Sequence, residues 1–135
     1  PRFLPASKIN GAAIDQAIIS DGCIIDRSRI SQSLIGVRCL IASGCRVHRS
    51  ILLGSNNYET EASKAASDRD GIPRIGVGAN TRIENTIVDK NARIGADCII
   101  TPEDKPEHLD GENYFIRDGI VIIPKNAVIP GGTVI

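Results

Sequence analysis

An apolar side chain returns at nearly constant intervals along most of the chain. From residue 35 to residue 54 (IGVRCLIASGCRVHRSILLG) the apolar positions Ile35, Ile41, Val47 and Leu53 lie six residues apart. This interval fits neither an amphipathic strand, whose pattern repeats every second residue, nor a helix, whose pattern repeats about every 3.6 residues. It is typical of hexapeptide repeats, in which very short strands alternate with tight corners around a coil.

The spacing of the anchors predicts how many corners make one coil. Three steps of five or six residues lead from Ile9 to Ile25, and three more lead from Ile25 to Ile41, so each set takes 16 residues. A triangular coil closes in that length. We therefore expect three stacked faces, with Ile9, Ile25 and Ile41 on the first, Ile14, Ile30 and Val47 on the second, and Ile19, Ile35 and Leu53 on the third.

Two polar segments interrupt the repeat. Residues 55–74 contain an alanine-rich middle between turn signals, which predicts a short helix, and residues 101–119 contain two prolines and the pair Tyr114-Phe115. The repeat runs between and after them, at Val77, Ile83, Val88, Ile94, Ile100, Ile123, Ile129 and Ile135. We predict an all-β fold over residues 9–135, a β-helix of about six triangular coils with these two excursions. Residues 1–8 are expected to be a linker from an upstream domain.

Composition narrows the class of protein. The 135 residues suit one domain, and 41% hydrophobic with 24% charged residues is typical of a globular protein. Only 2 Phe, 2 Tyr and no Trp fit an interior of narrow aliphatic layers. A net charge of zero favours neither nucleic acid nor an anionic membrane as partner. Since no apolar run of about twenty residues occurs, we expect a cytoplasmic protein without a membrane segment.

The cysteines follow the same register as the anchors. Cys23, Cys39, Cys45 and Cys98 each stand four residues after an apolar anchor, and no CxxC spacing occurs. We interpret them as small core residues, and we predict neither a disulfide framework nor a metal site.

His48 is the residue to consider for catalysis, because hexapeptide acyltransferases use a histidine on a coil of this kind. It directly follows the anchor Val47, a position that normally points outward at a corner, and His108 lies in the second excursion beside Pro106 and Glu107. Solvated surface histidines are the simpler interpretation, so we predict no catalytic residue in this chain. A free-standing acyltransferase and a purely structural β-helix spacer are the alternative functions.

A pair of lysines occurs in two copies of one pattern. VDKNARI (88–94) and IPKNAVI (123–129) place Lys90 and Lys125 two residues after an anchor. If the second excursion uses no corner, the two lysines lie on neighbouring coils with backbones about 5 Å apart. A bound dianion such as phosphate would relieve the repulsion between their ammonium groups. The alternative is that both splay into water or pair with Asp89, Asp118 or Glu84.

Several segments carry a specific resemblance. PRFLPASK, SLIGVRCLI, SILLGSNNYET, IPRIGVGANTRIENTIVDKNARIG and YFIRDGIVIIPKNAVIPGGTVI, in this order, resemble the carboxyl-terminal domain of the ADP-glucose pyrophosphorylase (glucose-1-phosphate adenylyltransferase) family over nearly the whole chain. The segment TPEDKPEHLDGEN differs from the sequence that is usual in this family. The resemblance therefore leaves open which metabolite regulates the protein.

This resemblance implies a left-handed parallel β-helix that packs on an amino-terminal nucleotidyltransferase domain and helps to build a homo- or hetero-tetramer. The parent enzyme converts ATP and glucose 1-phosphate to ADP-glucose and pyrophosphate with Mg²⁺, for glycogen or starch synthesis, in plastids if the source is a plant. The family's catalytic loop and metal-binding aspartates belong to the upstream domain. The chain alone is therefore not expected to make ADP-glucose.

The resemblance also assigns residues to regulation. Lys90 and Lys125 match the two lysines of the family's activator motifs, and Arg2 matches a basic residue that lines the same anion site. We therefore expect a regulatory and oligomerisation domain whose allosteric site, at Arg2, Lys90 and Lys125, binds a phosphorylated metabolite.

Overall fold

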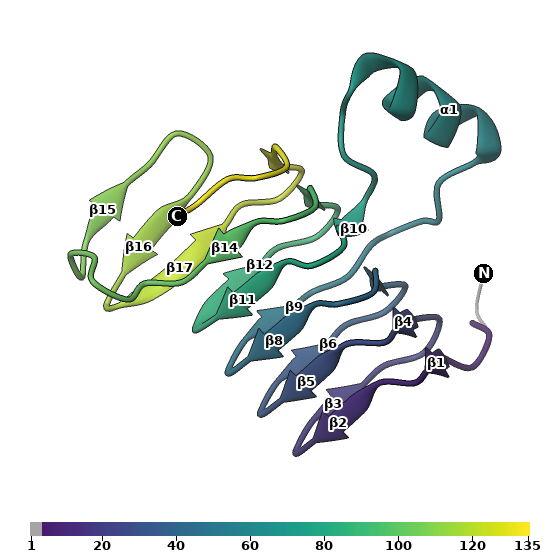
Figure 1. Ribbon diagram of the computed structural model, residues 1–135, viewed down its shortest axis with the longest axis horizontal. Helices are drawn as coiled ribbons and strands as arrows, with labels where there is room; N and C mark the ends of the chain where they lie inside the picture. Colours follow the sequence, from purple (N-terminus) through teal and green to yellow (C-terminus); the bar gives the residue numbers. More distant parts are fainter. Residues whose placement is uncertain (1–3) are drawn as a thin grey trace.

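Three parallel sheets form the faces of a triangular stack in the computed structural model, which describes residues 4–135 (Figure 1). The first face contains β1 (Lys8–Asn10), β4 (Ile24–Asp26), β7 (Leu40–Ile41), β10 (Gly76–Val77), β13 (Arg93–Ile94) and β18 (Val128–Ile129). The second contains β2 (Ala13–Asp15), β5 (Arg29–Ser31), β8 (Arg46–His48), β11 (Arg82–Glu84) and β14 (Ile99–Ile100). The third contains β3 (Ile18–Ile19), β6 (Leu34–Ile35), β9 (Ile51–Leu52), β12 (Thr86–Val88) and β17 (Ile120–Ile123).

The strand register confirms the three-corner coil. Ile9 pairs with Ile25 and Ile25 with Ile41 on the first face, one coil apart in each case. Ile30 pairs in the same way with Ile14 and with Val47 on the second face. Ile25, Ile30, Ile41 and Val47 are buried, and layers of such side chains stack from coil to coil into one continuous core. In the first coil Ile14 is only partly buried, and Ile9 is exposed.

One predicted anchor on the third face is wrong. Leu52, and not Leu53, pairs with Ile35 and is 1% exposed, whereas Leu53 is only half-buried. The left-handed residue of this corner, Arg49 at a φ of 49°, stands two residues after Val47, as in the other five-residue steps, whereas in a six-residue step it stands three residues after the anchor, as Gly44 does after Ile41. Ser50 then takes the small inward position that the other five-residue steps also carry.

Small residues at the corners bond the backbone of neighbouring coils. The Oγ of Ser33 accepts a hydrogen bond from the backbone N–H of Ser50 at 3.2 Å, and the Oγ of Ser50 accepts one from Thr86 N–H, also at 3.2 Å. The Sγ of Cys45 donates to the carbonyl of Gly78 at 3.0 Å. These buried hydroxyls and thiols therefore satisfy backbone groups that the tight corners leave without strand partners.

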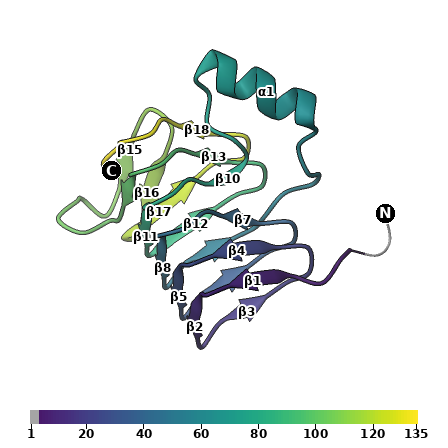
Figure 2. The same ribbon diagram turned by 45° about the vertical axis from the view of Figure 1, so that its right-hand side comes forward.

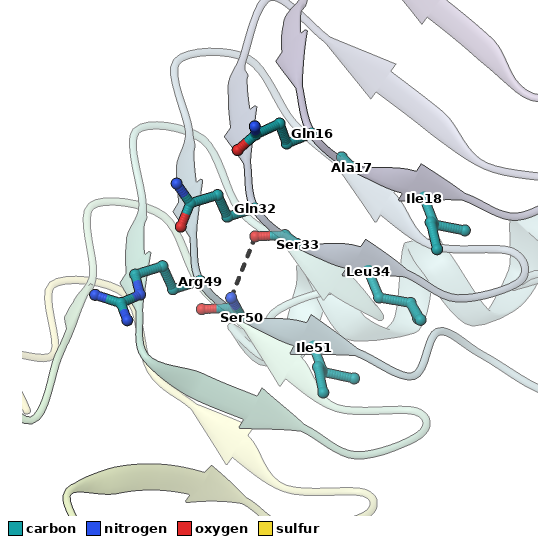
Figure 3. Close-up of a pocket in the computed structure, with 9 residues that line it drawn as sticks. All are labelled: Gln16, Ala17, Ile18, Gln32, Ser33, Leu34, Arg49, Ser50 and Ile51. Atoms are coloured by element: carbon teal, nitrogen blue, oxygen red, sulfur yellow. Dashed lines mark hydrogen bonds between the residues drawn. The ribbon is translucent and has the colours of Figure 1, made fainter.

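Outward side chains form columns with the same period. Figure 3 shows Ile18, Leu34 and Ile51 in one column on the third face, and Gln16, Gln32 and Arg49 in a second column at the adjacent corner. They line a shallow groove of about 710 Å³. Equivalent positions of successive coils therefore lie side by side on the surface as well as in the core.

The first excursion contains the predicted helix, α1 (Glu61–Asp70), which stands outside the stack (Figure 2). The Oγ1 of Thr60 accepts the N–H of Ser63 at 3.0 Å, which caps its amino terminus, and Gly71 ends it at a φ of 71°. Within the described residues, no helix has the length and apolar character needed to cross a membrane.

The second excursion forms a hairpin that extends the third face. β15 (Leu109–Asp110) pairs antiparallel with β16 (Phe115–Arg117), and β16 pairs antiparallel with β17. Beyond the hairpin, Val88 of β12 pairs directly with Ile123 of β17. The second excursion therefore uses no corner of the coil. This is the condition on which Lys90 and Lys125 were predicted to lie on neighbouring coils.

Candidate functional site

Lys90 and Lys125 lie next to each other at one corner, between the third and the first face. Each is two residues beyond the paired anchors Val88 and Ile123. The backbone N–H of Asn126 donates to the carbonyl of Lys90 at 3.0 Å, so the two corners are in direct contact. Both lysine side chains are exposed. The juxtaposition predicted from the register is thereby confirmed, whereas binding of an anion stays a prediction.

The carboxylates that could have neutralised these lysines have other partners. Asp89 accepts the backbone N–H of Lys90 at 2.7 Å, Glu84 forms an ion pair with Arg82 at 2.8 Å, and Asp118 lies 3.8 Å from the Nε2 of His108. Within residues 4–135, neither lysine ammonium forms an ion pair. Two positive charges on adjacent coils therefore face solvent together, which favours binding of an anion at this corner.

An asparagine follows each lysine and completes the turn. Asn91 and Asn126 both have a φ of 62°, a left-handed conformation that asparagine tolerates better than most residues. The Oδ1 of Asn91 accepts the backbone N–H of Asn56 at 2.9 Å. The first excursion therefore leaves the coil directly beside the corner that carries Lys90 and Lys125, which we call the lysine corner. Both asparagines line a groove of about 390 Å³ that lies between this corner and the excursion.

A largely buried ion pair attaches the first excursion to the coil beside this corner. The guanidinium of Arg93 lies 2.9 Å from Glu59, and their side chains are 21% and 4% exposed. Arg93 also donates to the carbonyl of Pro73 at 2.9 Å and to the Oγ of Ser67 at 3.2 Å. One arginine of the coil therefore contacts both ends of the excursion and its helix.

Comparison with known proteins identifies the fold. A family model described as the GLGC left-handed parallel β-helix domain matches residues 2–134. The chain belongs to this family. The hand of the coil that the resemblance implied, and the resemblance itself, are thereby confirmed.

A curated relative matches the chain over its whole length. It is the glucose-1-phosphate adenylyltransferase small subunit, chloroplastic/amyloplastic, of Triticum aestivum, which is 41% identical over 138 residues. The match covers 100% of this chain and 29% of the relative. The chain therefore spans less than a third of the length of that relative.

The sequence alone did not single out Arg93 and Glu59 as parts of the GLGC domain's lysine corner. Arg93 stands three residues after Lys90 in KNARI, and Glu59 stands in the segment NYET, both of which carried the resemblance. The available signal was a pair of opposite charges, one inside the first excursion and one on the coil after it. Their pairing could not be inferred, because no repeat spacing relates residue 59 to residue 93.

The remaining candidate residues lie elsewhere in the GLGC domain or outside the described residues. Arg2 falls outside residues 4–135. His48 is on β8 of the second face, where its Nδ1 is 2.7 Å from the Oγ of Ser31, and His108 is exposed in the second excursion. Neither histidine lies at the lysine corner.

The cysteines occupy the interior, as predicted. Cys23, Cys39, Cys45 and Cys98 are all free thiols and all buried. Burial raises the pKa of the Cys39 thiol far above its ordinary value, because the thiolate would lose its hydration there. This thiol is therefore a packing group and not a nucleophile.

Proposed function

We propose that this chain is the regulatory and oligomerisation domain of a glucose-1-phosphate adenylyltransferase. The family membership and the 41% identity to the Triticum aestivum small subunit support the parent enzyme. In this proposal an upstream nucleotidyltransferase domain carries the Mg²⁺-dependent conversion of ATP and glucose 1-phosphate to ADP-glucose and pyrophosphate. No residue of the present chain is assigned to that chemistry, and other subunits of a tetramer are the expected partners.

The regulatory part of the proposal depends on one observation: two lysines lie on adjacent coils, and neither forms an ion pair within residues 4–135. Lys90 and Lys125 present their ammonium groups at one corner, and the nearby carboxylates are engaged with other groups. A phosphorylated metabolite bound there would bridge the two coils, and Arg2 would add a third positive charge. If the same anion also contacts the upstream domain, its binding favours one arrangement of the two domains.

Binding of inorganic phosphate tests this assignment. Calorimetric titration of the wild type, Lys90→Ala and Lys125→Ala should show affinity weakened about tenfold or more in each variant, because each loses a charge-assisted hydrogen bond. Lys105→Ala, which removes a lysine of the second excursion, is the matched control and should bind as the wild type does. Equal affinity in all four proteins would exclude a phosphate site at this corner.

The proposed parent enzyme also suggests a cellular compartment for this protein. The relative's name places that relative in chloroplasts or amyloplasts. We propose the plastid as the compartment if the source is a plant and the cytoplasm otherwise.

A further inference from the structure

The second face of the coil carries a column of arginines. Arg29 on β5, Arg46 on β8 and Arg82 on β11 pair in register, each stands directly before a buried anchor, and all three are exposed. Because neighbouring strands lie roughly 5 Å apart, their outward guanidinium groups stand side by side. Like charges in this arrangement destabilise a sheet unless an anionic group neutralises them.

Arg82, the last member of the column, has a carboxylate partner. Its Nε donates to Glu84 at 2.8 Å. Within residues 4–135, the guanidinium groups of Arg29 and Arg46 form neither an ion pair nor a hydrogen bond, and the same holds for Arg49 at the adjacent corner. These three exposed side chains of the second and third coils, which we call the arginine patch, therefore face solvent without a counter-charge.

The surroundings of the arginine patch suit an acidic polypeptide segment. The strands of the second face contain no Phe, Tyr or Trp, so they offer no platform on which nucleic-acid bases could stack. The outward neighbours of Arg29 and Arg46 on their own strands are Ser31 and His48, whose Oγ and Nδ1 lie 2.7 Å apart and carry no negative charge. Guanidinium groups bind carboxylates through two parallel hydrogen bonds, which favours aspartate and glutamate as partners.

The second excursion is an acidic segment that this chain itself supplies. It contains six Asp or Glu residues and two Lys or Arg residues. In the described part of the chain, the carboxylates of Glu103, Asp104 and Glu107 form no ion pair. The hydrogen bond to Glu84 raises the pKa of the Arg82 guanidinium, and the nearby Glu103 adds to this rise. The excursion therefore begins at the Arg82 end of the column, and the arginine patch of the same copy lies one and two coils beyond it.

We propose that the second faces of two copies pack antiparallel about a two-fold axis, so that the acidic excursion of each copy lies on the arginine patch of the other. An axis parallel to the strands reverses the direction of the stack, and each ion pair then occurs twice. In this arrangement Ile99 on β14, which is 39% exposed, lies near the axis and supplies an apolar centre between the charged ends. The inference rests on the proposed function, whose oligomerisation supplies the second copy, and it names the surface involved.

Charge reversal tests the inference by sedimentation velocity on the natural protein that carries these 135 residues. The double variants Arg29→Glu/Arg46→Glu and Glu103→Lys/Asp104→Lys should each lower the association constant about tenfold or more, because like charges then face one another. An equimolar mixture of the two variants should associate as the wild type does, since both contacts of the mixed pair again join opposite charges. Arg69→Glu, which reverses an exposed charge on α1, is the matched control and should leave association unchanged.

Several outcomes would overturn the inference. If either double variant associates as the wild type does, the two surfaces do not meet, and the oligomerisation in the proposed function stands through other contacts. The same conclusion holds if the mixture fails to recover while both variants keep the circular dichroism of the wild type. If the wild type stays monomeric at every concentration, the oligomerisation in the proposed function fails first. A monomeric wild type that binds poly-L-glutamate would show that the arginine patch takes a different acidic partner and not a second copy.

Discussion

The excursions at residues 55–74 and 101–119 interrupt the same coil but are attached to it by different chemistry. The first is held by polar contacts, chiefly the Glu59–Arg93 ion pair, and the only buried residue of its helix is Ser67. The second is held by an apolar side chain, Ile116, which is 0% exposed and lies opposite the equally buried Val121. Its ion pair between Arg117 and Asp110 is largely exposed to solvent.

This difference indicates which excursion needs a precise position. Apolar burial is non-directional, so an isoleucine keeps a hairpin on the sheet without fixing the exact path of its loop. A buried guanidinium with several acceptors is directional and imposes one geometry. The excursion attached in this second way is the one that forms a wall of the groove beside Lys90 and Lys125.

Removal of the apolar contact should have the largest effect on stability. Ile116→Ala should lower the free energy of unfolding by about 3–4 kcal/mol, because it deletes buried methyl groups and leaves a cavity under the hairpin. Urea unfolding followed by circular dichroism measures this loss. Ile120→Ala, at a neighbouring position that is 39% exposed, is the control and should cost less than about 1 kcal/mol. Equal losses in the two variants would show that the hairpin is not held by Ile116.

Removal of one partner of the polar contact should have a smaller but strongly coupled effect. Arg93→Met or Glu59→Gln should each cost about 2–3 kcal/mol, because the remaining charge stays poorly hydrated in a mostly buried place. The double variant should cost at least about 1 kcal/mol less than the sum of the single variants. Urea unfolding of all four proteins provides this cycle. Strictly additive losses would mean that the two side chains do not stabilise each other.

The sequence predicts the coil far better than its attachments. Each layer packs like the one below it, so the period placed Ile9, Ile25 and Ile41 on one face. It placed Lys90 beside Lys125 on the condition that the second excursion uses no corner, which the pairing of Val88 with Ile123 confirms. The single wrong anchor, Leu53, arose in a run of three apolar residues, where the period could not tell which one points inward. The corner conformation at Arg49 decides this, and it favours Leu52.

The excursions carry no period, and their contacts were therefore missed. The short helix could be predicted from local signals, since alanines between turn residues favour it whatever it packs against. Ile116 was not recognised as a core residue, because it reaches the interior through an antiparallel hairpin and not through the five- or six-residue step. The Glu59–Arg93 pair likewise depends on where a non-repeating loop returns to the coil.

The smallest expected effect concerns an exposed ion pair at the end of the polar excursion. Asp68 accepts two hydrogen bonds from Arg74, at 3.1 Å and 2.6 Å, and these bonds hold the pKa of the Asp68 carboxyl below its ordinary value of 3.8. Because the folded-state pKa is lowered, any stability from this pair is present above about pH 4 and is lost as the pH falls through the lowered pKa. The contribution is small, since solvent screens both groups.

An NMR titration of the Asp68 carboxyl carbon measures this directly. In Arg74→Gln the pKa of the Asp68 carboxyl should rise toward 3.8. An unchanged Asp68 pKa would show that Arg74 does not hold this end of the excursion. The first excursion would then depend on its contacts with the coil, chiefly those of Arg93 with Glu59, Ser67 and Pro73, and the double-variant cycle measures the strongest of them.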